Sequence, residues 1–151
     1  VTMDAGPRGG SFVVRLRGDV APIMGARLLT LVRRGYYDGL TWHRVEHDFV
    51  VQGGCPNARI GGKPKGPPGT GGPGWTIKCE TKDNPQTHKV GALSMAHAGK
   101  DSGGSQFFMV LSESSTRHLN GVHTVFGQIT GGLDIMKQLT ASDHMVTVRV
   151  S

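Results

Sequence analysis

Long apolar stretches are missing from this sequence of 151 residues. No run approaches the ~18–20 residues that a membrane-spanning helix needs. The N-terminus also lacks the apolar core of a signal peptide. We therefore expect no membrane segment and a cytoplasmic location. The start at Val1 rather than at Met leaves room for an upstream segment that has been removed.

Cysteine is also scarce, with only Cys55 and Cys79 in the chain. One disulfide between them would stabilise the fold by ~3–4 kcal/mol on the chain-entropy model. Two separate thiols in a reducing compartment are an equally good interpretation. The cysteines lack the CxxC spacing of zinc sites, and the seven histidines are dispersed. The pattern predicts no metal site and no cofactor.

Signatures of covalent catalysis are absent too. No Gly-x-Ser-x-Gly motif occurs, and neither cysteine has a histidine beside it in the sequence. The 11 acidic residues fall mostly in predicted loops, so a catalytic carboxylate pair is not indicated. The net charge of +6 raises the question of nucleic-acid binding. However, the 17 Lys and Arg residues are scattered, which favours a solvated basic surface and no nucleic-acid partner.

Glycine, in contrast, is abundant. The 24 glycines are about a sixth of the chain, against a usual ~7%, and they indicate many turns and a β-rich fold. The length suits one domain over residues 1–151, which we expect to be a monomer. The predicted strands are residues 1–4, 11–17, 41–45, 49–53, 92–96, 107–111, 123–129 and a last strand in which Val146, Val148 and Val150 alternate. A turn is expected at residues 6–10.

Two helices are predicted. Pro22 suits the start of the first and Gly35 its end. Between them Met24, Leu28, Leu31 and Val32 recur at helical spacing. The second helix covers residues 133–139, with Ile135, Met136 and Leu139 on one face. Residues 54–74 form a long loop, and loops of that length are usually functional or disordered. Eight short strands with short links favour a closed antiparallel β-barrel capped by the two α-helices.

The stretch LSMAHAGKDSGGSQFFMVL, residues 93–111, stands out from this pattern. Its second strand should turn Phe107, Met109 and Leu111 toward the core, because strand side chains alternate between faces. The opposite face then carries Gln106, Phe108 and Val110. An amide beside an aromatic ring on an outer face indicates the floor of a groove.

Together with TWHRVEHDFVVQGG (residues 41–54) and HLNGVHTVFGQI (residues 118–129), this stretch resembles the cyclophilin family of peptidyl-prolyl cis-trans isomerases. The resemblance implies a mainly β fold, an eight-stranded barrel, and catalysed rotation about Xaa-Pro bonds that assists protein folding. The partners it implies are proline-containing peptides and unfolded proteins. On pattern alone, an arginine such as Arg44 is more often a surface residue; the resemblance makes it catalytic, with Gln52 holding its guanidinium.

The resemblance also implies a set of substrate-binding residues. They are Phe49, Val50, Ala96, His97, Ala98, Gln106, Phe108, His118, Leu119 and His123. The chain departs from the family pattern at Trp42 (usually Phe), Val50 (often Met), His97 (Asn) and His118 (often Trp). We expect His97 to leave substrate binding intact, since that position mainly uses main-chain atoms. Cyclosporin binding should be weak, since an imidazole at His118 is smaller than an indole.

The chemistry is consistent with these residue types. Rotating a peptide bond crosses a barrier of ~18–20 kcal/mol but breaks no covalent bond. No nucleophile is needed, only a donor aimed at the prolyl nitrogen and an apolar pocket. The alternative is a proline-peptide-binding scaffold module with little catalysis, suggested by His97, His118 and the long loop. Retention of Arg44 and Phe108 favours the enzyme.

Overall fold

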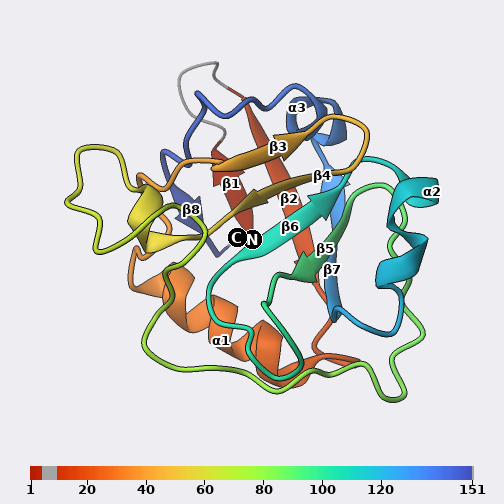
Figure 1. Cartoon of the computed structure of the whole chain (residues 1–151). Helices are drawn as coiled ribbons and strands as arrows, with labels where there is room; N and C mark the ends of the chain where they lie inside the picture. Colours follow the sequence, from red (N-terminus) through yellow and green to blue (C-terminus); the bar gives the residue numbers. More distant parts are fainter. Residues whose placement is uncertain (5–9, 151) are drawn as a thin grey trace.

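The computed structural model describes residues 1–4 and 10–150. The predicted turn at residues 6–10 lies outside this part of the chain, apart from Gly10. Eight strands form one antiparallel sheet in the order β3-β4-β6-β5-β7-β2-β1-β8, which confirms the mainly β prediction (Figure 1). The strands are β1 (Thr2–Asp4), β2 (Ser11–Leu16), β3 (Arg44–Glu46), β4 (Val50–Gly53), β5 (Ala92–Met95), β6 (Phe107–Val110), β7 (Val125–Gly131) and β8 (Val148–Arg149).

The sheet curls so that its two edge strands approach each other. Within the described residues β3 and β8 share no strand ladder; an isolated bridge between Thr41 and His144 joins the chain segments that lead into them. The backbone N–H of Met145 donates to the carbonyl of Leu40 at 2.8 Å beside this bridge. The eight strands therefore form a half-barrel, whereas the prediction was a closed barrel; its two edges are linked by this short seam and not by an eighth full strand pair.

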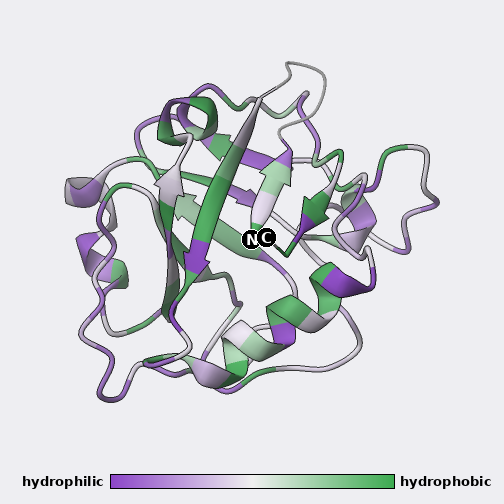
Figure 2. Cartoon of the chain, turned by 180° about the vertical axis from the view of Figure 1, so that it is seen from behind, coloured by the Kyte–Doolittle hydropathy of each residue, from purple (hydrophilic) through white to green (hydrophobic). Residues whose placement is uncertain are grey.

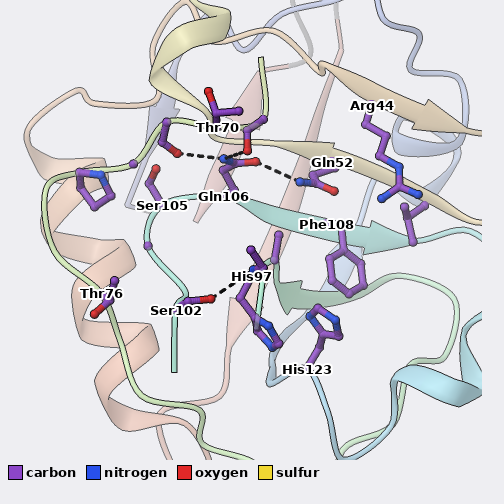
Figure 3. A pocket seen from close by; sticks show the side chains of 18 of the residues that line it. Arg44, Gln52, Thr70, Thr76, His97, Ser102, Ser105, Gln106, Phe108 and His123 are labelled. Atoms are coloured by element: carbon purple, nitrogen blue, oxygen red, sulfur yellow. Dashed lines mark hydrogen bonds between the residues drawn. The ribbon is translucent and has the colours of Figure 1, made fainter. Parts of the chain in front are cut away.

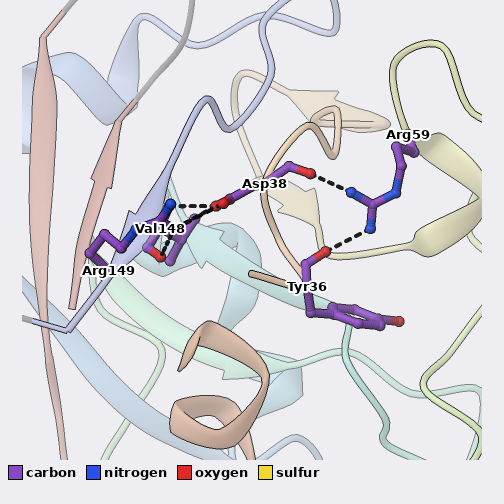
Figure 4. Close-up of polar contacts among 5 residues, drawn as sticks. All are labelled: Tyr36, Asp38, Arg59, Val148 and Arg149. Atoms are coloured by element: carbon purple, nitrogen blue, oxygen red, sulfur yellow. Dashed lines mark hydrogen bonds and ion pairs between the residues drawn. The ribbon is translucent and has the colours of Figure 1, made fainter. Parts of the chain in front are cut away.

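Polar side chains reinforce the seam (Figure 4). The Asp38 carboxylate accepts from the backbone N–H of Val148 at 3.0 Å and from the Arg149 guanidinium at 2.9 Å. Arg59 donates to the backbone carbonyls of Tyr36 and Asp38. The loop after the first helix, the start of the long loop and β8 are thereby connected.

Helix α1 (Pro22–Arg33) confirms the spacing argument, because Met24, Leu28, Leu31 and Val32 are all buried. Figure 2 shows apolar and polar segments along this helix. Its first turn has no side-chain cap of its own. Instead, the Glu80 carboxylate accepts from the backbone N–H of Met24 at 2.7 Å, which satisfies a donor that a helix start leaves free. Helices α1 and α3 (Leu133–Lys137) lie at opposite ends of the curled sheet (Figure 1).

The two faces of β6 behave as predicted. Phe107 and Met109 are fully buried in the main core, which also contains Phe12, Trp42 and Phe126. Leu111 is partly buried and packs against that core. On the other face, Phe108 and Val110 belong to a second apolar cluster with Val50, Ala92 and Val125. This second cluster lies under the candidate site.

The predicted bounds of several strands were wrong, and three short helices were not predicted. Strand β3 begins at Arg44 rather than at residue 41, and β7 begins at Val125 rather than at residue 123. The last strand keeps only Val148–Arg149, the residues that pair with β1. Of the three alternating valines only Val148 is buried, whereas Val146 and Val150 are 41% and 46% exposed. Three short helices were not predicted: α2 (Glu113–Thr116) and the 3-10 turns η1 (Pro56–Ala58) and η2 (Arg117–Leu119). Such short turns carry no apolar periodicity.

Candidate active site

The outer face of β4 and β6 forms the floor of a cavity of about 590 Å³ (Figure 3). We call this cavity the groove. Register places Arg44 opposite Gln52 and Gln52 opposite Phe108, so three predicted site residues lie side by side. All the predicted site residues except His118 line the groove: Arg44, Phe49, Val50, Gln52, Ala96, His97, Ala98, Gln106, Phe108, Leu119 and His123.

One end of the groove is apolar. Phe108 is only 4% exposed and stands on the second apolar cluster. The ring of His88 stacks on it with centroids 5.7 Å apart, and the edge of His123 approaches it at 5.5 Å. Phe49, Ala96 and Leu119 pack against the same cluster. The phenyl ring of Phe108 is therefore packed against two imidazoles, and only a small part of it is exposed at the apolar end of the groove.

His88 was not predicted as part of the site. It is buried, and its two ring nitrogens lie 2.8 Å from Asn120 Oδ1 and from Ser94 Oγ. Burial lowers the pKa of His88 below its usual value, which favours a neutral ring behind Phe108. The sequence signal was weak, because a lone histidine in a polar segment is usually exposed.

Arg44 is the one Lys or Arg among the described residues that line the groove. Its guanidinium carbon lies 5.6 Å from the centre of the Phe49 ring. Its Nη2 forms an ion pair with the Glu46 carboxylate at 3.1 Å, and its side chain is 48% exposed. A half-exposed guanidinium is free to donate into the groove from its remaining N–H groups.

Gln52 does not hold Arg44 as expected. Its side-chain amide donates to Gln106 Oε1 at 3.0 Å. The Gln106 amide nitrogen in turn donates to the carbonyls of Gly69 and Gly71, each at 2.9 Å (Figure 3). Arg44 instead pairs with Glu46 and lies beside Phe49, whereas the Gln52 amide is directed toward Gln106 (Figure 3).

His97 and His123 stack face to face with centroids 3.9 Å apart. His97 Nε2 lies 3.1 Å from the carbonyl of Val122, and His123 Nδ1 lies 2.9 Å from the carbonyl of Met95. Burial lowers the pKa of His123, and the neighbouring His97 lowers it further. The ring of His97 therefore forms part of the groove wall together with His123.

His118 lies outside the groove. Its exposed ring stacks on Phe49 with a centroid distance of 6.0 Å and an interplanar angle of 11°. It thus extends the aromatic surface of Phe49 at the edge of the apolar end. Leu119, its neighbour in η2, does line the groove.

The opposite wall of the groove comes from the long loop and was not predicted residue by residue. Residues 69–73, Trp75 and Thr76 line it, together with Ser102, Gly104 and Ser105. Arg27 of α1 lies over the Trp75 ring at 5.1 Å, which fixes the loop to the helix. The only available sequence signal was the length of the loop.

Both cysteines are free, so the two-thiol interpretation holds. Cys55 is buried, whereas Cys79 is partly exposed, with its sulfur 3.9 Å from His97 Nε2. Among the described residues no group of three or more His, Cys, Asp or Glu side chains could hold a metal ion. In the same part of the chain, no helix is long and apolar enough to cross a membrane.

An aromatic floor, two linked amides and one arginine lie along the cavity, an arrangement that suits an extended chain carrying an apolar ring. Comparison with known proteins agrees. The family model "Cyclophilin type peptidyl-prolyl cis-trans isomerase/CLD" matches residues 1–150. The chain belongs to this cyclophilin family, and it is a peptidyl-prolyl cis-trans isomerase.

Individual relatives support the assignment. Peptidyl-prolyl cis-trans isomerase B of Bacillus subtilis is 53% identical over 142 residues, covering 94% of this chain and 92% of that protein. A peptidyl-prolyl cis-trans isomerase of Helicobacter pylori is 44% identical over 141 residues, covering 92% and 80%. The crystal structure of a cyclophilin-type isomerase of Cryptosporidium parvum superposes with a TM-score of 0.81 at 24% identity, covering 99% and 98%. That likeness concerns the fold.

Proposed function

We propose that Arg44 is the catalytic residue of this isomerase and that the apolar end of the groove holds the proline ring of the substrate. The observation that carries the proposal is the position of Arg44 directly beside that end, with Phe49 under its guanidinium. A peptide whose proline ring lies on Phe108 would bring its prolyl nitrogen close to this cation.

The expected chemistry is electrostatic. Rotation about the Xaa-Pro bond removes amide conjugation, and the prolyl nitrogen becomes a better hydrogen-bond acceptor as it does so. A charged donor contributes ~1.5–3 kcal/mol to such an interaction, and each ~1.4 kcal/mol is a tenfold change in rate. Arginine suits the role because its fork of donors stays planar and charged. Glu46 keeps one side of the fork occupied, so the remaining N–H groups are the ones available.

The amide pair Gln52–Gln106 has a different role in this proposal. Both amides face the groove between the apolar end and the loop wall. They are suited to bind the backbone of the peptide next to the proline. Ala96, His97 and Ala98 flank the same path on the β5 side.

The substrates follow from the groove. We infer that proline-containing segments of unfolded proteins enter it, because the described lining is mostly neutral and carries few side chains that would select a sequence. The Cryptosporidium parvum structure was determined in the presence of the dipeptide Ala-Pro, which fits a site of this kind. We further propose that residues 1–151 act as one monomeric isomerase domain in the cytoplasm, and that cyclosporin binds weakly.

A binding experiment tests the assignment of the apolar end. Isotope-labelled protein is titrated with a peptide that contains Ala-Pro and with a matched peptide that has Ala in place of Pro. The proline peptide should shift the NMR signals of Phe108, Leu119 and His123, and the matched peptide should not. Equal shifts with both peptides would remove the proline ring from this end and favour a general peptide-binding module.

A further inference from the structure

The loop wall of the groove contains a short segment, residues 69–71, that we call the rim. In both of its glycines, Gly69 and Gly71, the backbone carbonyl and the backbone N–H are each hydrogen-bonded, and the two bonds go to different side chains. The carbonyls of Gly69 and Gly71 accept from the Gln106 amide. Their N–H groups both donate to the sulfur of Cys55, at 3.2 and 3.3 Å. One buried thiol therefore holds two points of the rim.

Cys55 is well placed for this. It lies two residues after the end of β4 at Gly53 and is 0% exposed, so its sulfur is fixed relative to the floor of the groove. Sulfur is a weak hydrogen-bond acceptor. Among the described residues, however, no other side chain accepts a hydrogen bond from these two N–H groups. Gln106 fixes the carbonyls from the groove side, and Cys55 fixes the N–H groups from behind.

The residues behind the rim are packed closely against it, with no room for an additional side chain at Gly71. A Cβ at Gly71 would come within 2.9 Å of Pro56 Cγ and 3.0 Å of Asn57 Nδ2. Asn57 itself donates to Thr70 Oγ1 at 3.1 Å. The rim thus stands against η1, and its distance from the floor is set by the residues at the start of that turn.

We propose that Cys55 is a positioning residue that sets the place of the rim, and thereby the affinity of the groove for the peptide residues that flank the proline. The proposal deepens the proposed function and rests on its placing of the proline ring at the apolar end. The apolar end does not contact Cys55, so the isomerisation step itself should not depend on the thiol.

The test compares Cys55→Ala, which removes the acceptor, with Cys55→Ser, which keeps one. Two probes are used: a blocked Ala-Pro dipeptide, and the same dipeptide extended by three residues on each side. NMR exchange measurements at equilibrium give affinity and turnover for each. Cys55→Ala should weaken binding of the long peptide at least threefold, with turnover at saturation within twofold and the dipeptide unaffected. Hydrogen exchange of the backbone amides of Gly69 and Gly71 should become at least tenfold faster in Cys55→Ala. Cys55→Ser should restore most of the affinity for the long peptide and most of the protection from exchange.

A second variant moves the rim without touching the thiol. Gly71→Ala drives a methyl group against Pro56 and should also weaken the long peptide selectively; it decides the matter if Cys55→Ala does not fold. Gly18→Ala is the matched control, because a Cβ there meets nothing within 4 Å and the residue lies outside the groove.

Two results would overturn the proposal: unchanged long-peptide binding in Cys55→Ala, or equal effects of Gly71→Ala on both probes. Equal behaviour of the serine and alanine variants would show that packing, not the acceptor, matters, and would overturn it as well. The proposed function fails separately, if Arg44→Ala leaves turnover of the dipeptide unchanged.

Discussion

Arg44 and Gln52 face each other across the β3–β4 ladder, yet their side chains leave in different directions. Arg44 pairs with Glu46 and lies over Phe49, whereas Gln52 bonds to Gln106. The cation lies on β3, and the amide pair joins Gln52 on β4 to Gln106, which immediately precedes β6. Substitutions of one should leave the geometry of the other nearly unchanged.

Replacing Arg44 by alanine should reduce the isomerisation rate at least tenfold, because the donor to the prolyl nitrogen is lost. The side chain is half exposed and buries little apolar surface, so the thermal midpoint should stay within a few degrees of the parent. A protease-coupled assay on an Ala-Pro peptide measures the rate. Arg33→Ala, an exposed change on α1, serves as control. A well-folded Arg44 variant with near-normal activity would contradict the assigned role.

Stability should fall as the pH is lowered below about 6.5, the ordinary histidine value. Burial lowers the pKa of His43, His88 and His123. Below pH 6.5 the unfolded chain therefore binds more protons than the folded chain, and the unfolding free energy decreases with decreasing pH. Above that value the rings are neutral in both states and the effect disappears. Urea unfolding at pH 7.5, 6.0 and 5.0 measures the slope.

One variant isolates the contribution of a single ring. His88→Gln removes the titrating group and should flatten the slope between pH 6.5 and 5, even though it lowers stability at every pH. His47→Gln, an exposed change in the turn after β3, should leave the slope as it is. An unaltered slope in the His88 variant would mean that folding does not lower the pKa of this ring.

The two thiols should differ in reactivity. Cys79 is partly exposed and should react with a thiol reagent in the folded protein within minutes, whereas buried Cys55 should react only on unfolding. Titration should find one reactive thiol under native conditions and two in denaturant without reductant. Finding none in denaturant would show a disulfide, which the structure does not contain.

Cyclosporin affinity should be low and should depend on His118. This exposed imidazole covers less apolar area beside Phe49 than an indole would; a loss of ~1–3 kcal/mol follows from the area. His118→Trp should therefore tighten binding at least tenfold, while isomerase activity persists in both forms. Calorimetric titration of the two proteins is the measurement. Nanomolar binding by the parent, or no gain in the tryptophan variant, would show that another residue governs affinity.

Much of the fold was readable from the sequence because its signals are local. The apolar spacing in α1 named buried residues correctly, and the alternation in β6 assigned its side chains to the correct faces. The alternation did not show that Phe108 and Val110 on the second face are buried as well. The register of Arg44 with Gln52 followed from the short turn between their strands. The last strand was overextended, because alternation among Val146, Val148 and Val150 does not reveal which valines have a partner to pack against.

From the residue pattern alone, the site was predictable only where neighbouring strands bring residues together; the other predicted lining residues came from the family resemblance. The bond from Gln52 to Gln106 joins side chains 54 positions apart, and the bonds from the rim to Cys55 depend on how a glycine-rich loop folds back. Neither leaves a periodic mark in the sequence. His88 was missed for the same reason, because its burial comes from Asn120 and Ser94 and not from its own segment.

The curled sheet places Arg44 on β3, an edge strand of three residues paired on one side only, whereas Phe108 lies on β6, paired on both sides. Strands with few partners open locally at a lower free-energy cost than central strands. The proposed catalytic cation is thus carried by a segment that should contribute little to global stability, and the proposed floor for the proline ring by one that should contribute much. Substitutions around Arg44 should therefore be able to change turnover with little loss of global stability. Substitutions of Phe108 that change which ring binds should also lower the stability of the fold.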